Sequence, residues 1–157
     1  MNAGEGYWSI LDPIWDAIEI DTPESFERTF KTVKRSVGLL YAAHFCQSEV
    51  CNGGFTQFFR NSTGVLAPEA IEGFLAIGQP GVSSVVQNAI ALLGSPFKRH
   101  RASRWSILAG LSGNPDPRLY QRILQFEPLE REFYTLLESE AGGFESAADR
   151  YAERISI

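Results

Sequence analysis

Apolar residues recur at intervals of three and four along most of the chain, which is the spacing of one face of an α-helix. At the start, Trp8, Leu11, Trp15 and Ile18 predict a first amphipathic helix, in which Pro13 is tolerated only near the first turn or as a kink. No segment alternates apolar and polar residues over the roughly four to eight positions that mark a half-buried strand. The pattern therefore predicts an all-α fold.

Glycine, proline and capping residues divide the chain into about nine short helices. Thr22-Pro23-Glu24-Ser25 is a helix start, because threonine can cap the first amides and proline suits the first helical position. Between residues 34 and 52, apolar side chains cover most of the helix circumference, which predicts a buried central helix ended by Gly53-Gly54. Further helices are expected over residues 55–60, 67–77, 80–93, 97–111, 115–126, 128–139 and 144–155.

The length of 157 residues, with 44% of them apolar, suits one compact domain over residues 1–157, and the predicted loops are short. The longest uninterrupted apolar stretch, residues 38–43, is far below the ~20 residues that a bilayer crossing needs. Residues 1–14 carry acids and no basic residue ahead of an apolar run, the opposite of a signal peptide. We therefore expect a cytoplasmic protein that does not contact membranes.

Few side chains of the kinds used for nucleophilic catalysis or soft-metal binding are present: His44, Cys46, Cys51 and His100. His44 and Cys51 are seven residues apart on one helix, about 10.5 Å at ~1.5 Å per residue, which is too far to bind one zinc ion. Cys46 and Cys51 point in different directions and cannot easily form a disulfide. We expect core thiols and a hydrogen-bonded core histidine, with no metal, cofactor or catalytic residue.

One stretch has the character of a motif: residues 49–64 have the sequence E-V-C-N-G-G-F-T-Q-F-F-R-N-S-T-G. It resembles the signature E-V-N-N-G-G-F-x-Q-F-F-x-N-S-S-G of a bacterial family of domains of unknown function, whose best-characterised member is a DNA-mimic protein. Cys51 replaces an asparagine of that signature, and Thr63 replaces a serine. The resemblance extends more loosely from residues 8–15 to Gly142-Gly143-Phe144.

The resemblance implies an all-helical fold and no known catalytic activity. In the characterised member it also implies a dimer whose acidic surface occupies the DNA site of a repressor, so a homodimer is one expectation for this chain. Most relatives have no assigned function.

The motif residues also have a physical interpretation of their own. Glu49 lies near a helix C-terminus, where the helix dipole disfavours an acid by ~0.3–1 kcal/mol. Backbone amides released at residues 53–55 and amide side chains nearby would compensate for its charge. We favour a structural corner made by Glu49, Asn52, Gly53, Gly54, Phe55, Gln57, Phe58 and Asn61. The alternative is a small-molecule or enzymatic pocket that uses Glu49, Asn52, Gln57 and Asn61.

Charge is distributed unevenly along the chain. The formal net charge of -5 argues against direct nucleic-acid binding, yet residues 1–30 carry -6 and residues 98–104 carry +4. Asp12, Asp16 and Glu19 are expected on one helical stripe, with carboxylates roughly 6 Å apart, comparable to the phosphate repeat of DNA. Together with the family resemblance, this predicts a non-enzymatic regulatory protein that presents carboxylates to a DNA-binding protein: Asp12, Asp16, Glu19, Asp21, Glu24 and Glu27.

The basic residues 98–104 oppose this hypothesis, because a mimic of DNA should not display four cations in seven residues. We expect a solvated or ion-paired helix start, in which Arg101 and Arg104 pair with Glu130 or Glu132. Four acids of the C-terminal part could extend the acidic surface: Glu127, Glu130, Glu138 and Glu140. An immunity or antitoxin-like protein, whose target does not bind DNA, is a further alternative.

Overall fold

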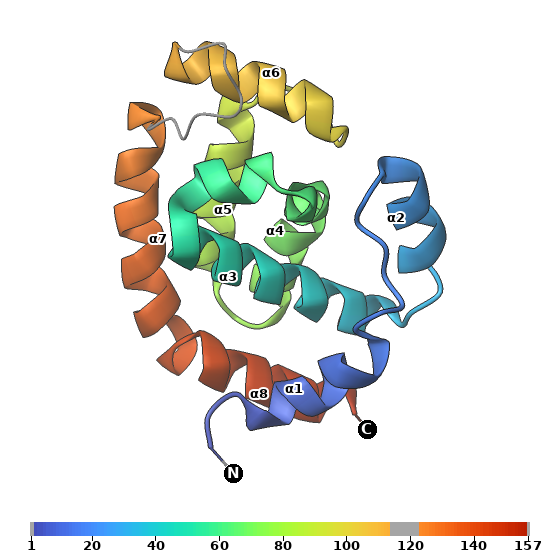
Figure 1. The fold of residues 1–157 in the computed structure, drawn as a ribbon. Coiled ribbons are helices and arrows are strands. Elements are labelled where there is room, and N and C mark those ends of the chain that lie inside the picture. The colour runs from blue at the N-terminus through green and yellow to red at the C-terminus, as the bar shows by residue number, and fades with distance from the viewer. Residues whose placement is uncertain (1, 114–122, 157) are drawn as a thin grey trace.

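The computed structural model describes residues 2–113 and 123–156, and every regular element within them is helical, which confirms the all-α prediction (Figure 1). The α-helices are α1 (Glu5–Leu11), α2 (Pro23–Phe30), α3 (Arg35–Arg60), α4 (Ala67–Ala76), α5 (Pro80–Leu92), α6 (Arg101–Ser112), α7 (Glu127–Ser139) and α8 (Phe144–Ile155). Short 3-10 helices are η1 (Asp12–Ile14), η2 (Ser62–Leu66), η3 (Leu124–Phe126) and η4 (Glu140–Gly142). None of the described helices combines the length and hydrophobicity that a bilayer crossing requires.

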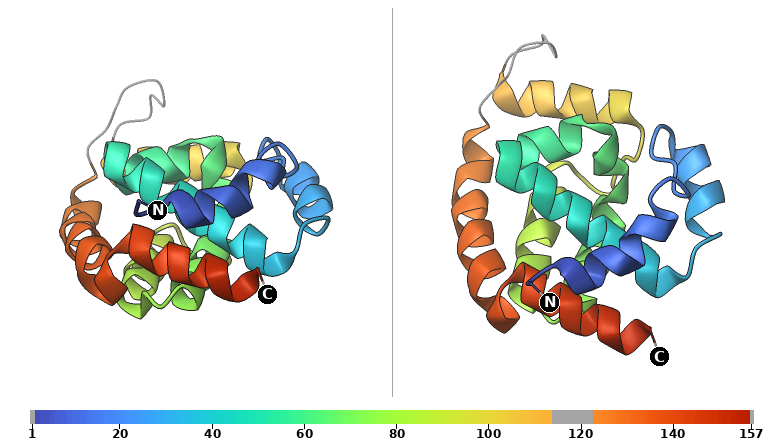
Figure 2. Two further views of the ribbon diagram at one scale, coloured as in Figure 1. Left: turned by 90° about the horizontal axis from the view of Figure 1, so that it is seen from below. Right: turned by 60° about the horizontal axis from the view of Figure 1, so that its bottom comes forward.

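Helix α3 runs through the middle of the molecule, and the other helices surround it (Figures 1 and 2). Leu40 and Val50 of α3 have no exposed surface, as expected for the predicted central helix. Helix α4 approaches α3 closely at Gly73, which has no side chain. A Cβ atom at this position would overlap the carbonyl oxygen of Leu39 on α3. At Gly53 and Gly54 the backbone leaves the helical conformation, so α3 consists of two helical segments joined by a kink. The predicted end of the central helix therefore lies at that kink.

The first helix is shorter than predicted. Helix α1 ends at Leu11, and Pro13 lies in the 3-10 helix η1, because proline lacks an amide donor and its ring clashes with the preceding helical turn. Asp16 follows in a turn, and Glu19 lies outside any regular element. The prediction that Asp12, Asp16 and Glu19 form one helical stripe is therefore wrong.

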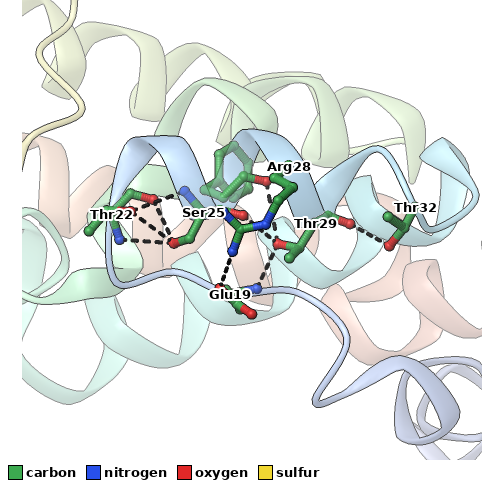
Figure 3. Close-up of polar contacts among 7 residues, drawn as sticks. Glu19, Thr22, Ser25, Arg28, Thr29 and Thr32 are labelled. Atoms are coloured by element: carbon green, nitrogen blue, oxygen red, sulfur yellow. Dashed lines mark hydrogen bonds and ion pairs between the residues drawn. The ribbon is translucent and has the colours of Figure 1, made fainter.

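The predicted start of α2 is confirmed (Figure 3). Thr22 and Ser25 form a capping box: the Ser25 amide donates to Thr22 Oγ1 over 3.0 Å, and the Thr22 amide donates to Ser25 Oγ over 3.2 Å. This reciprocal pair satisfies amides that a helix start leaves without partners. Phe26 and Phe30 of α2 are buried against the core.

Around residues 97–126 the prediction is only partly tested. Helix α6 begins at Arg101 instead of residue 97, and Arg99, just before it, donates from Nη1 to the carbonyl oxygen of Val65 over 2.7 Å. Residues 115–122 of the helix predicted over 115–126 lie outside the described residues. The described end of that range forms the 3-10 helix η3.

Candidate functional site

The kink of α3 places the polar residues of the motif against one another. One carboxylate oxygen of Glu49, Oε2, accepts hydrogen bonds from Gln57 Nε2 and Asn61 Nδ2, each over 2.9 Å. Asn52 Nδ2 donates to Gln57 Oε1 over 3.2 Å. Glu49 is half-buried. Because Gln57 and Asn61 donate to its carboxylate, its charge is compensated by side-chain amides from the second segment of α3 and its C-terminal cap.

The amide of Phe55 has a different partner from the one predicted. It donates to Oε1 of Glu130, on α7, over 3.1 Å, so a carboxylate distant in sequence caps the second segment of α3. The expectation that this amide compensates Glu49 is wrong. The cap also explains Gly54, which has a φ of 73° and whose Cβ would overlap Glu130 Oε1. At Gly53, a Cβ would overlap Gln57 Oε1.

The aromatic residues of the motif belong to the core. Phe55, Phe58 and Phe59 have no exposed surface. The Phe55 ring lies 5.8 Å from that of Phe126 and 5.5 Å from that of Phe133. These side chains hold the kink against η3 and α7 and are not available to a ligand.

Arg104, on α6, caps the C-terminal end of α3. It is 1% exposed, and its guanidinium donates to the backbone oxygens of Phe59 (2.8 Å), Asn61 (2.9 Å) and Arg99. Burial lowers its pKa to about 10, with a smaller contribution from the positive charge of Arg101, so it remains charged at neutral pH. Cations are favoured at helix C-termini, where carbonyl groups lack helical partners.

The other basic residues of this region also contact the body of the protein. Arg99 forms an ion pair with the buried Glu69 over 2.7 Å. Arg101 Nε and Trp105 Nε1 both donate to the carbonyl oxygen of Arg60, over 2.9 and 2.7 Å. Among the described residues, neither Arg101 nor Arg104 pairs with Glu130 or Glu132, so that prediction is wrong. The carbonyl oxygens at the end of α3 take the place of those carboxylates.

An open surface depression of about 520 Å³ lies beside the motif. Its lining consists of polar residues and one thiol: Gln47, Ser48, Glu49, Cys51, Asn52 and Gln57. Burial, followed by the charge of Glu138, raises the pKa of the Cys51 thiol, which disfavours the nucleophilic thiolate. Within residues 2–113 and 123–156, no cluster of three or more His, Cys, Asp or Glu side chains could hold a metal ion.

His44 is a core residue. It is 8% exposed, its Nδ1 lies 3.1 Å from the hydroxyl of Tyr7, and the rings of Trp8, Trp15 and Phe45 pack around it. Burial lowers its pKa to about 4, so the imidazole is neutral at pH 7. It shares a hydrogen bond with the Tyr7 hydroxyl and does not face solvent as a catalytic base would.

Residues 12–27, called the acidic segment below, contain six acids and no basic residue. Two of the acids have partners: Glu19 pairs with Arg28 over 2.9 Å (Figure 3), and Glu24 lies 3.7 Å from His100. The carboxylates of the other four are exposed and, within the described part of the chain, have no hydrogen bond or ion pair: Asp12, Asp16, Asp21 and Glu27. The predicted residues thus divide into two carboxylates with a basic side chain beside them and four available carboxylates.

Acids in the C-terminal part of the chain serve as helix caps. The carboxylate of Glu140 accepts the amides of Gly81 and Val82, each over 2.8 Å, at the start of α5. Asp149, on α8, accepts the amides of Gly4 and Tyr7 over 2.7 and 2.9 Å at the start of α1. Together with Glu130, these residues are held by backbone amides, so Glu130 and Glu140 do not simply extend an acidic surface. A sequence shows the acid but not the distant helix start that it caps.

The comparisons with known proteins concern the part of the chain that contains helices α3 to α8. A family model described as DMP19-like protein matches residues 33–155. This range includes the motif, residues 49–64, but begins after the acidic segment. No curated protein and no solved structure matches the chain.

Proposed function

The chain belongs to the DMP19-like protein family, whose function is uncharacterised, and from this premise we propose that it acts by binding another protein through its acidic segment. The partner we propose is a DNA-binding regulator, with the carboxylates occupying its nucleic-acid site. The supporting observation is that the carboxylates of Asp12, Asp16, Asp21 and Glu27 are exposed and have no hydrogen-bond or ion-pair partner in the described part of the chain. Since the family match begins at residue 33, the proposal concerns this chain and not the family as a whole.

Electrostatics gives this surface its specificity. Arg28 and His100 lie beside Glu19 and Glu24, but the other four carboxylates have no paired cation. These four produce a negative potential, which attracts basic surfaces and speeds their encounter. Nucleic-acid sites are the most basic surfaces that many regulators expose. The carboxylates follow η1, the irregular connection after it and α2, so the proposed mimicry rests on the sign and density of charge and not on a helical repeat.

The test is displacement of DNA from a regulator that the wild-type protein captures from the native cell. Labelled duplex DNA bound to that regulator should be released by the wild-type protein, less effectively as salt is raised. A variant with Asp12→Asn, Asp16→Asn, Asp21→Asn and Glu27→Gln should compete about tenfold or more weakly at low ionic strength.

A matched control removes four other exposed carboxylates, through Glu132→Gln, Glu138→Gln, Glu145→Gln and Glu153→Gln. It has the same net charge as the first variant, and we expect it to compete like the wild type. Equal losses in both variants, or capture that never displaces DNA, would contradict the proposal.

A second candidate function is binding of a small polar molecule, which the open depression beside Glu49 favours. A low-molecular-weight extract of the native cell would then raise the Tm of the wild type but not of Glu49→Gln. Under our main proposal the extract changes neither Tm, and Glu49→Gln only lowers stability by ~1 kcal/mol, because it weakens the hydrogen bonds from Gln57 and Asn61.

A further inference from the structure

A row of aromatic rings lies partly exposed next to the acidic segment. The rings of Trp8 and Trp15 are 5.4 Å apart, and those of Trp15 and Phe45 are 5.0 Å apart. Trp8 is 40% exposed, while Trp15 and Phe45 are half-buried. The row thus leads from α1, through the connection after η1, onto α3.

Carboxylates flank this aromatic row at two points. The amide of Asp12 donates to the carbonyl oxygen of Trp8, so the turn between them is helical and both side chains share a face. Asp16 directly follows Trp15. Burial, followed by the charge of Asp16, raises the pKa of Tyr41, whose ring lies 4.7 Å from that of Phe45. Asp12 and Asp16 are two of the four available carboxylates.

Elsewhere the chain places its own arginines over aromatic rings. The guanidinium of Arg101 lies 5.0 Å from the ring centroid of Trp105, and that of Arg60 lies 6.0 Å from it. Arg99 lies 5.3 Å from the ring of Phe26. Within the described residues no such cation lies over Trp8 or Trp15. These two tryptophans therefore have the acids and the rings of a cation site without an internal cation.

We propose that Trp8 and Trp15, with Asp12 and Asp16, receive an arginine side chain of the partner. This inference rests on the proposed function and names the residue type that the acidic segment recognises. A guanidinium is planar and weakly hydrated, so it can stack on an aromatic ring while it donates to carboxylates. An ammonium is compact and strongly hydrated, so lysine gains less from the rings.

The experiment compares nona-arginine and nona-lysine peptides, which carry the same charge, by isothermal titration at low ionic strength. We expect nona-arginine to bind the wild type about two- to fivefold more tightly than nona-lysine. Trp8→Phe keeps an aromatic ring and should retain most of this preference. Trp8→Leu keeps an apolar side chain without a ring and should reduce the preference toward one.

Leu75→Ala, which truncates an apolar residue that is 60% exposed on α4, is the control and should leave the preference unchanged. Circular dichroism checks that each variant folds. If Trp8→Leu does not fold, the preference of the wild type for nona-arginine over nona-lysine tests the inference by itself. Equal binding of both peptides to the wild type would overturn the inference but leave the proposed function standing. Binding of neither peptide would count against both.

Discussion

The motif corner, residues 49–64, and the acidic segment, residues 12–27, are both rich in polar side chains but use them differently. In the corner, Glu49 accepts two amide hydrogen bonds, and Arg104 reaches in to cap the end of α3. In the acidic segment, four of six carboxylates extend into solvent, and only Glu19 has a close ion pair. The corner lies within the family match and the acidic segment lies outside it.

The difference separates residues that hold the fold from residues available for binding. Buried polar groups stabilise a structure when they have partners, and the corner provides partners for Glu49 and for the carbonyl oxygens of Phe59 and Asn61. Among the described atoms, the buried Thr63 Oγ1 has none. Exposed like charges repel one another, so the four unpaired carboxylates contribute little to stability, and their negative potential is available to a binding partner. Substitutions in the two regions should therefore affect different measurements.

The largest effect is expected from Arg104→Met in the corner. It leaves the backbone oxygens of Phe59, Asn61 and Arg99 buried without their donor, which should lower the free energy of unfolding by about 3–5 kcal/mol or prevent folding. Arg101→Met, which removes an exposed guanidinium, should lower it by less than about 1 kcal/mol. Chemical denaturation measures the free energy of unfolding of both variants. Equal losses would contradict the claim that the buried Arg104 cap stabilises the fold more than an exposed arginine does.

His44, which packs beneath the tryptophans of the N-terminal region, should make stability depend on pH. Its pKa is about 4 in the folded protein, below the ordinary histidine value of 6.5, so the unfolded chain binds more protons between these values. Stability from this group is present above pH 6.5 and is lost as pH falls toward 4, by at most about 3 kcal/mol. His44→Gln should flatten this part of the pH profile. His100→Gln, which replaces the exposed histidine, is the control variant.

Gly54→Ala tests the kink that forms the corner. Alanine at a φ of 73° and ψ of -176° is strained, and its Cβ would displace Glu130 from the Phe55 amide, so we expect a loss of about 2 kcal/mol. Gly110→Ala is the matched control, since that glycine is helical and nothing lies within 4 Å of a Cβ there. It should raise stability by ~0.5–1 kcal/mol. Thermal or chemical unfolding that ranks the two variants alike would contradict the role of the kink.

Local signals in the sequence predicted the helical class, the buried central helix and the start of α2 at Thr22. These features depend on neighbouring residues, and their physics is therefore visible in short windows. The pairing of Glu130 with the Phe55 amide, 75 residues away, and the burial of Arg104 depend on which helix ends meet in space. Spacing alone also carried the first helix too far, because the conformational effect of Pro13 outweighed the apolar repeat of Trp8, Leu11 and Trp15.

The smallest change in stability is expected from the acidic segment, and its direction is informative. Replacing Asp12, Asp16, Asp21 and Glu27 by their amides removes like charges that have no described partner, so stability should stay within ~0.5 kcal/mol or rise. Glu19→Gln, which removes the ion pair with Arg28, should instead lower stability slightly, by less than about 1 kcal/mol. Denaturation at low and high salt distinguishes the two variants, since repulsion between like charges is screened as ionic strength rises.

If the fourfold variant is clearly destabilised, these carboxylates hold the fold, and the contrast between the two regions fails. If it is as stable as the wild type and no longer displaces DNA, the same carboxylates act in binding alone.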